Sequence, residues 1–165
     1  MLGRAAQPQP TQTPLWLLAW WDTFGHSGGR ELRVVVVEDA AGEVVGILPL
    51  LRRWVMRGGV IPVATLELLG TGEDIDDEIF SEYLGAIVAR GYEGAVAAEL
   101  AETLSGDRVG AWDELHLRAM RADDPTIAPL VDELHLRAIE AELRVTHECP
   151  YIALPATWEG YVGAL

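Results

Sequence analysis

The chain has 165 residues and is 50% hydrophobic, which is enough for one globular domain that buries most of its apolar surface. Its net charge of −14 gives a surface that repels phosphate backbones and anionic lipids, so we expect neither nucleic acid nor a membrane as a partner. Cys149 is the single cysteine, which excludes an internal disulfide.

The first part of the sequence carries no targeting signal. Residues 1–14 contain three prolines among Gln and Thr and lack an apolar signal core, so we predict a disordered tail. The most apolar stretch, residues 15–21, is shorter than the roughly 20 apolar residues that a spanning helix needs. A cytoplasmic location is therefore expected.

The remaining sequence mixes strand and helix patterns. The predicted elements, in chain order, are a helix at 15–25, strands at 31–38 and 43–51, a basic loop at 52–59, a strand at 65–70, an acidic loop at 71–80, a strand at 81–88, a helix at 92–105, a strand at 112–120, a helix with apolar positions from 127 to 141, a strand at 143–154, and a helix starting after Thr157. Pro49 indicates a bulge or a sheet edge. Thr126 is preferred over Asp124 as the cap of the helix that follows it. This order predicts an α/β (α+β) fold with a mixed, mainly antiparallel sheet flanked by helices.

One seven-residue sequence occurs twice. Asp113–Ala119 recurs unchanged as Asp132–Ala138. The first copy alternates within a strand pattern, whereas the second lies within a helical pattern. We therefore predict two different structures for the same seven residues, with the tertiary context deciding each.

Several short segments, taken in their order along the chain, resemble one family of enzymes. They are Leu17–Trp21, Glu43–Leu50, Leu69–Gly72 with Ser81–Leu84, and Cys149–Pro155 with Trp158–Tyr161. Together they resemble the N-terminal half of the large GNAT-type acyltransferases known as CelD-like, which are similar to the FemAB peptidoglycan transferases. The resemblance covers residues 15–165.

The resemblance implies a domain organisation and a function. Residues 15–155 would form a GNAT-like N-terminal lobe, and residues 156–165 would begin a helix, cut short here, that leads to a second lobe absent from this chain. The acyl-CoA co-substrate of the longer protein is expected mostly in that second lobe, and no cofactor is expected in this one. The implied function is the non-catalytic lobe of an acyl-CoA-dependent N-acyltransferase, such as an acetyltransferase that uses acetyl-CoA. Its partners would be the missing C-terminal lobe and a small-molecule or glycan amine acceptor.

A degenerate CoA-type loop follows the predicted strand at 81–88. A GNAT lobe binds pyrophosphate with a splayed strand and the amino end of the next helix, where free amides favour anions. The resemblance places Gly85, Arg90, Gly91 and Gly94 at these positions. They match the family pattern Gln/Arg-x-x-Gly-x-Gly/Ala poorly, and Glu93 adds a charge that repels phosphate. We therefore predict a structural copy of the loop that binds no coenzyme A.

Other polar residues are candidates for the acceptor side. Glu82 and Tyr83 suit a polar role facing a cleft, and Arg52 and Arg53 of the basic loop would help to shape the acceptor pocket. No metal site is predicted, because the acidic loop at 73–78 lacks the glycine and the closing glutamate of a calcium loop. His147 and Cys149 likewise lack the two further ligands that zinc needs.

Two other functions remain open at this level. The chain could be a free-standing binding or scaffold module that keeps a GNAT-like fold without catalysis. It could also be a complete small acetyltransferase. The reading frame after Leu165 would separate these alternatives from the two-lobed enzyme.

Overall fold

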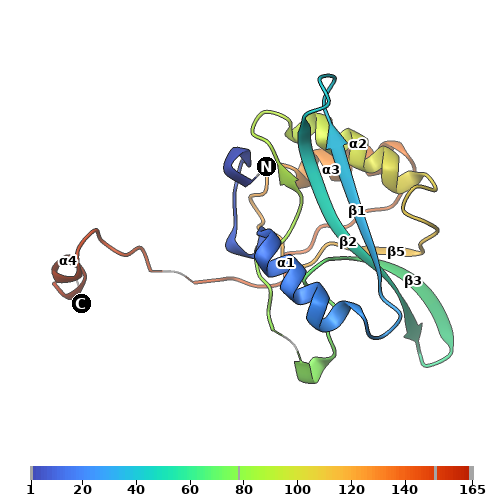
Figure 1. Cartoon of the computed structure of the whole chain (residues 1–165), viewed down its shortest axis with the longest axis horizontal. Coiled ribbons are helices and arrows are strands. Elements are labelled where there is room, and N and C mark those ends of the chain that lie inside the picture. The colour runs from blue at the N-terminus through green and yellow to red at the C-terminus, as the bar shows by residue number, and fades with distance from the viewer. Residues whose placement is uncertain (1, 78, 151, 164–165) are drawn as a thin grey trace.

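The computed structural model describes residues 2–77, 79–150 and 152–163, and it contains one five-stranded sheet flanked by helices (Figure 1). The strands are β1 (Glu31–Glu38), β2 (Val44–Arg57), β3 (Ile61–Leu68), β4 (Ile87–Val88) and β5 (Glu114–His116). Their order is β1-β2-β3-β5, and β4 pairs with β2 beside β3. The pairs β1–β2, β2–β3 and β2–β4 are antiparallel, whereas β3–β5 is parallel. The predicted fold class, a mixed and mainly antiparallel sheet flanked by helices, is confirmed.

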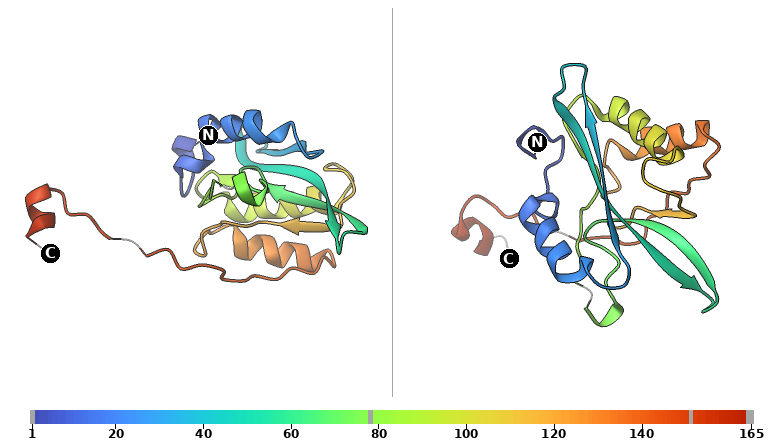
Figure 2. Two further views of the ribbon diagram at one scale, coloured as in Figure 1. Left: turned by 90° about the horizontal axis from the view of Figure 1, so that it is seen from below. Right: turned by 45° about the vertical axis from the view of Figure 1, so that its right-hand side comes forward.

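Helices cover both faces of the sheet (Figure 2). One face is covered by α1 (Pro14–Trp20), which continues into a π-helical turn, η3 (Trp21–Gly25). The other face is covered by α2 (Glu93–Ser105) and α3 (Ile127–Leu136), which pack on each other. The remaining helical segments are η1 (Leu2–Arg4), η2 (Pro10–Gln12), η4 (Ile75–Asp77) and α4 (Trp158–Val162).

The helices begin and pack as the sequence pattern predicts. The hydroxyl of Thr13 accepts a hydrogen bond from the Trp16 amide, and Pro14 occupies the first helical position of α1, where no amide donor is needed. In α2, the stripe Val96, Leu100 and Leu104 is fully buried, as expected for a helix with one face on the core. Thr126 stands at the predicted N-cap position of α3, but its hydroxyl makes no capping hydrogen bond, and the Asp124 carboxylate accepts from the Thr126 amide at 2.8 Å.

Pro49 lies inside the central strand, at the position where β2 changes its neighbour. On that side of β2, residues 46–47 pair with β4 and residues 50–57 pair with β3. The Pro49 carbonyl accepts a hydrogen bond from the Leu69 amide, so the missing N–H of the proline points toward the same gap. The proline therefore breaks no bond of the β1–β2 ladder, and it marks the point at which β3 and β4 separate.

The first residues are not a free tail. The peptide groups of Ala5 and Ala6 run beside β4, with a bridge from Ala5 to Ala89 and a 2.9 Å hydrogen bond from the Ala6 amide to the Val88 carbonyl. Gln12 is buried. Residues 2–13 thus differ from the predicted disordered tail. The reason is that their backbone forms hydrogen bonds along the edge of β4 that does not pair with β2.

The predicted basic loop at 52–59 is mostly strand. β2 continues to Arg57, which pairs with Ile61 at the start of β3, and the turn contains Gly58 and Gly59 at positive φ. The strand-favouring residues Trp54 and Val55 were the signal for a strand, and the local charge concealed it. The predicted strand at 65–70 accordingly starts earlier, at Ile61.

Two other predicted strands are much shorter than expected. The strand predicted at 81–88 is reduced to β4, since Tyr83 and Gly85 have φ values of 56° and 143° that interrupt extended backbone. The strand predicted at 112–120 is reduced to β5, and Ala119 has a φ of 58°. Leu84 and Met120 still form an isolated parallel bridge.

The end of the chain leaves the body as an extended arm, residues 142–163 (Figures 1 and 2). The strand predicted at 143–154 is not formed in the parts of this range that are described, because no neighbouring strand pairs with it. The predicted helix is present as α4, and the Thr157 hydroxyl caps it by accepting from the Gly160 amide. Among the described helices, none is long and apolar enough to cross a bilayer.

Gly46 of β2 allows the close approach of α2 to the sheet. A Cβ atom at this position would lie 2.6 Å from Cγ1 of the fully buried Val96. We expect Gly46→Ala to lower the free energy of unfolding by about 1–3 kcal/mol through overpacking. Urea denaturation measures the change.

Two further variants control this experiment. Combining Gly46→Ala with Val96→Ala removes the clash, so the added loss caused by the alanine at position 46 should largely disappear. Gly94→Ala, on α2 with open space around it, should be neutral or stabilising by about 0.5–1 kcal/mol. An equal loss for Gly46→Ala with and without Val96 would contradict this account of the packing.

Candidate functional site

The junction between β4 and α2 is the place where a GNAT lobe would hold pyrophosphate. Arg90, Gly91 and Gly94 lie together there, since the chain leaves β4 and enters α2 through a turn in which Gly91 has a φ of 88°. Gly85 lies before β4, near Met120 and Asp124. The structure therefore joins three of the four predicted cofactor residues and separates the fourth.

Groups of the chain itself use the amides of this junction. The Gly91 amide donates to the Glu93 carboxylate, at 2.9 Å from Oε2 and 3.1 Å from Oε1, and the Arg90 amide donates to the Arg4 carbonyl at 3.1 Å. The Glu93 carboxylate is therefore bonded just before the amino end of α2, where its negative charge opposes the binding of a phosphate. A diphosphate would have to displace this carboxylate and would also meet its charge.

Tyr83 lies in a small polar cluster before β4. The Arg121 guanidinium lies 5.7 Å from the centre of the Tyr83 ring, and the Cys149 thiol of the arm lies near enough to the Tyr83 hydroxyl to affect its pKa. This contact is the main cause that raises the pKa of Tyr83, and the nearby Glu82 carboxylate acts in the same direction. The Glu82 side chain is exposed, while its carbonyl accepts from the Thr11 hydroxyl at 2.6 Å.

Arg52 and Arg53 point to opposite faces of β2, because successive residues of a strand alternate. Arg52 donates to the Ala111 carbonyl at 2.9 Å, and its guanidinium lies over the ring of Trp54. Arg53 forms two hydrogen bonds with the Glu67 carboxylate, of 2.8 and 3.1 Å. In the described part of the chain, no hydrogen bond or ion pair joins either arginine to Glu82 or Tyr83.

A charged cluster around Glu67 was not predicted. Glu67 is 4% exposed, and besides Arg53 it lies 4.0 Å from Nδ1 of His116. His116 Nε2 lies 3.2 Å from Oε2 of Glu114, which also pairs with Arg57. Gly72 passes directly over the Glu67 carboxylate, where a Cβ atom would collide with it. Held by two hydrogen bonds and covered by a loop, Glu67 connects β2, β3 and β5 and is poorly placed to accept a proton from a substrate.

The sequence indicated this cluster only by the alternation of polar and apolar residues. Glu67 alternates with Leu66 and Leu68 in β3, and His116 alternates with Leu115 and Leu117. That pattern predicts a polar face without stating which residues meet across it. Only the register, in which Glu67 is the partner of His116, brings the two together.

Comparison with known proteins assigns no family. No known family matches the chain, and no curated protein matches it. Among solved structures, the chain is similar to a point mutant of the BH1408 protein from Bacillus halodurans, with a TM-score of 0.45 and 14% identity over 89% of this chain and 79% of that one. At this level of similarity, no function transfers to this chain.

The Glu93 carboxylate should stabilise the amino end of α2. We expect Glu93→Ala to lower the free energy of unfolding by about 0.5–1 kcal/mol, because the Gly91 amide loses its acceptor and the helix dipole loses a favourable charge. Glu99→Ala is the matched control on the same helix. Glu99 is exposed and pairs only with Arg108 among the described residues, so its loss should stay within about 0.5 kcal/mol. Equal effects in urea denaturation would contradict the capping role.

The contact between Tyr83 and Cys149 should be measurable as a change in the pKa of Tyr83. Cys149→Ala removes the contact and should lower the pKa of Tyr83 toward its ordinary value, as followed by the NMR signal of its ring carbon. His147→Ala, also in the arm, should leave it unchanged. Because the folded-state pKa is raised, the stabilisation by this contact is present below the unfolded pKa of about 10 and is lost as the pH rises through the folded pKa. An unchanged titration in Cys149→Ala would show that the arm does not rest on Tyr83.

Proposed function

We propose that this chain is the N-terminal, non-catalytic lobe of an acyl-CoA-dependent N-acyltransferase and that it helps to form the cleft for an amine acceptor. The observation that carries the proposal is the junction of β4 and α2. Its topology is that of an anion-binding junction, a strand followed by a helix amino end, yet the Glu93 carboxylate binds the Gly91 amide there and adds a negative charge. A lobe that keeps this architecture and places its own negative charge at the junction is suited to a structural role.

The order of elements supports the same proposal. The chain runs α1, an antiparallel meander of three strands, β4, α2, β5 and α3, which matches the order expected from the resemblance to GNAT-type enzymes except for the last expected strand, at 143–154, which is not formed in its described part.

The chemistry is then divided between two lobes. A neutral amine attacks the thioester carbon, the C–S bond breaks, and the thiol of coenzyme A leaves with a proton. In this proposal the donor thioester lies in the other lobe. The contribution of this lobe would be made on the acceptor side, by Glu82 and Tyr83, which lie beside Arg121 and the arm.

A binding or scaffold module without catalysis is the second candidate. It is favoured by the exposed apolar side chains of the arm, among them Leu143, Val145, Ile152 and Leu154. Such a row of side chains suits a contact with another protein as well as a contact with a second lobe.

Calorimetric titration with acetyl-CoA tests the non-catalytic assignment. We expect no heat of binding and no release of coenzyme A when primary amines are added, because the Gly91 amide is already bonded and the nearby charge is negative. Binding with a micromolar dissociation constant would overturn the assignment and favour a complete small acetyltransferase. If the reading frame continues past Leu165, the longer product should bind acetyl-CoA, and its failure to do so would favour the scaffold module.

A further inference from the structure

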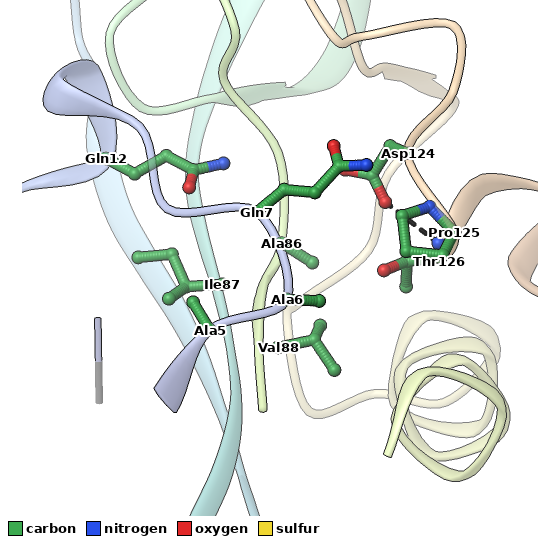
Figure 3. A pocket seen from close by; sticks show the side chains of 10 residues that line it. All are labelled: Ala5, Ala6, Gln7, Gln12, Ala86, Ile87, Val88, Asp124, Pro125 and Thr126. Carbon is green, nitrogen blue, oxygen red and sulfur yellow. Dashed lines mark hydrogen bonds between the residues drawn. The ribbon is translucent and has the colours of Figure 1, made fainter. Parts of the chain in front are cut away.

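The outer edge of β1 is an open edge of the sheet. In the described part of the chain, β1 pairs only with β2. The edge of β4 is different, because the N-terminal segment lies along it and encloses, beside Gly85, a small pocket of about 10 Å³ between residues 5–7 and 124–126 (Figure 3). An open strand edge presents unpaired N–H and C=O groups to any strand that approaches it.

The backbone groups of Leu32, Val34 and Val36 point to this open edge. Val34 is the partner of Pro49, whose carbonyl accepts from the Leu69 amide on the far side of β2. The N–H and C=O of one residue point the same way in an antiparallel ladder, so the groups of Pro49 and Val34 point away from each other. Leu32 and Val36 follow from Val34 by alternation, so three residues offer both a donor and an acceptor at the edge.

The same three residues also expose apolar side chains. Leu32, Val34 and Val36 are 38%, 46% and 51% exposed, whereas Val35 and Val37 are buried on the face that α2 covers. On the side of α2, a groove of about 220 Å³ runs along the edge of β1, so the helix leaves room for a further strand. Open backbone groups and an exposed apolar row therefore coincide at one edge.

We propose that β1 pairs antiparallel with β1 of a second copy of this chain, about a two-fold axis at Val34. The outward residues are spaced evenly about Val34, so this axis pairs Val34 with itself and Leu32 with Val36 of the second copy. All three then form hydrogen-bonded pairs. The axis also keeps equivalent faces of the two sheets together, so the exposed side chains form one continuous apolar row. The proposal does not rest on the acyltransferase function.

The charges at the ends of β1 fit this register. Glu31 lies opposite Val37 of the second copy, and Glu38 lies opposite its Arg30, so no like charges face each other. Among the described residues, neither Glu38 nor Arg30 forms an ion pair within the chain. The pairing therefore brings together two opposite charges that the single chain leaves apart.

The Arg33 side chain lies at the same edge and does not prevent the pairing. It donates to the Leu32 carbonyl at 3.0 Å, which agrees with the outward direction of that carbonyl, and to the Val109 carbonyl at 3.2 Å. A carbonyl oxygen has two lone pairs, so the Leu32 carbonyl can accept from the second copy as well.

Sedimentation equilibrium of the full chain tests the dimer. We expect a reversible monomer–dimer equilibrium with a dissociation constant of roughly 1 μM. Salt at roughly 0.3 M screens the repulsion between two copies that each carry a charge of −14, and a reductant prevents disulfide formation by the exposed Cys149. A chain that stays monomeric up to about 1 mM would refute the proposal.

Hydrogen exchange of the backbone amides identifies the surface that pairs. The amides of Leu32, Val34 and Val36 are open in the single chain, so they should exchange at least tenfold more slowly in the dimer than at high dilution. The amides of Val35 and Val37 already bond to β2 and should change much less. A dimer in which all three edge amides exchange as in the monomer is formed by another surface, which overturns the proposal.

Charged variants test the two-fold axis. Val34→Lys and Val34→Glu each place two like charges opposite each other, so each should weaken the dimer at least tenfold, while circular dichroism shows a folded monomer. An equimolar mixture of the two variants should dimerise again, and a mixture that stays monomeric would refute the axis at Val34. Val60→Lys is the matched control, because Val60 is also exposed but lies in the turn before β3, and it should dimerise like the wild-type protein.

The arm of a second copy is the competing occupant of this edge. It fits poorly, because Pro150 has no N–H and the exposed apolar residues change from odd positions at Val145 to even positions at Ile152. Val145→Asp should therefore leave the dissociation constant of the dimer unchanged. A tenfold loss in this variant would assign the edge to the arm and overturn the pairing of β1 with itself. None of these measurements depends on whether the chain binds acetyl-CoA.

Discussion

The fold depends on β2 as the common partner of three strands. β1 pairs along one side of it, and β4 and β3 share the other side. Two residues make this arrangement possible. Pro49 lies where the second side changes its partner, and Gly46 leaves room for Val96 of the helix above. A side chain at Gly46 would push α2 away from the sheet, and α2 is also the helix on which α3 packs.

The amino end of the same helix has the geometry of an anion-binding site, but here it contributes to the stability of the fold. The amino end of α2 follows a strand and a glycine turn, which is the arrangement that proteins use for phosphates. Here the Glu93 carboxylate accepts from the Gly91 amide just before the helix, and the Arg4 carbonyl accepts from the Arg90 amide. The N-terminal segment thereby closes the junction on one side and, a few residues later, encloses the pocket beside Gly85. Residues 2–13 therefore hold both features in place.

The sequence showed which positions of the sheet carry charged side chains, but it did not show which residues these side chains contact. Arg52 and Arg53 are neighbours in sequence and end on opposite faces, where one contacts Trp54 and the other Glu67. The three arginines among residues 52–59 suggested a loop, although Trp54 and Val55 favour a strand. Pairing with β3 fixes these residues as strand, and long-range pairing of this kind leaves no signal in a short window of sequence.

By itself the sequence determined the core stripe of α2, the cap at Thr157, and the hairpin of β1 and β2 with its antiparallel pairing. Each follows from local periodicity or from a local hydrogen bond. Only the tertiary structure decided the lengths of β4 and β5, the order of the N-terminal segment, and the lack of pairing in the described part of 143–154. The repeated heptapeptide gives the reason. Asp113–Ala119 contributes β5 because β3 offers a strand edge, whereas Asp132–Ala138 contributes the end of α3 because α2 offers an apolar face. The same seven residues therefore form a strand or a helix according to the element that packs against them.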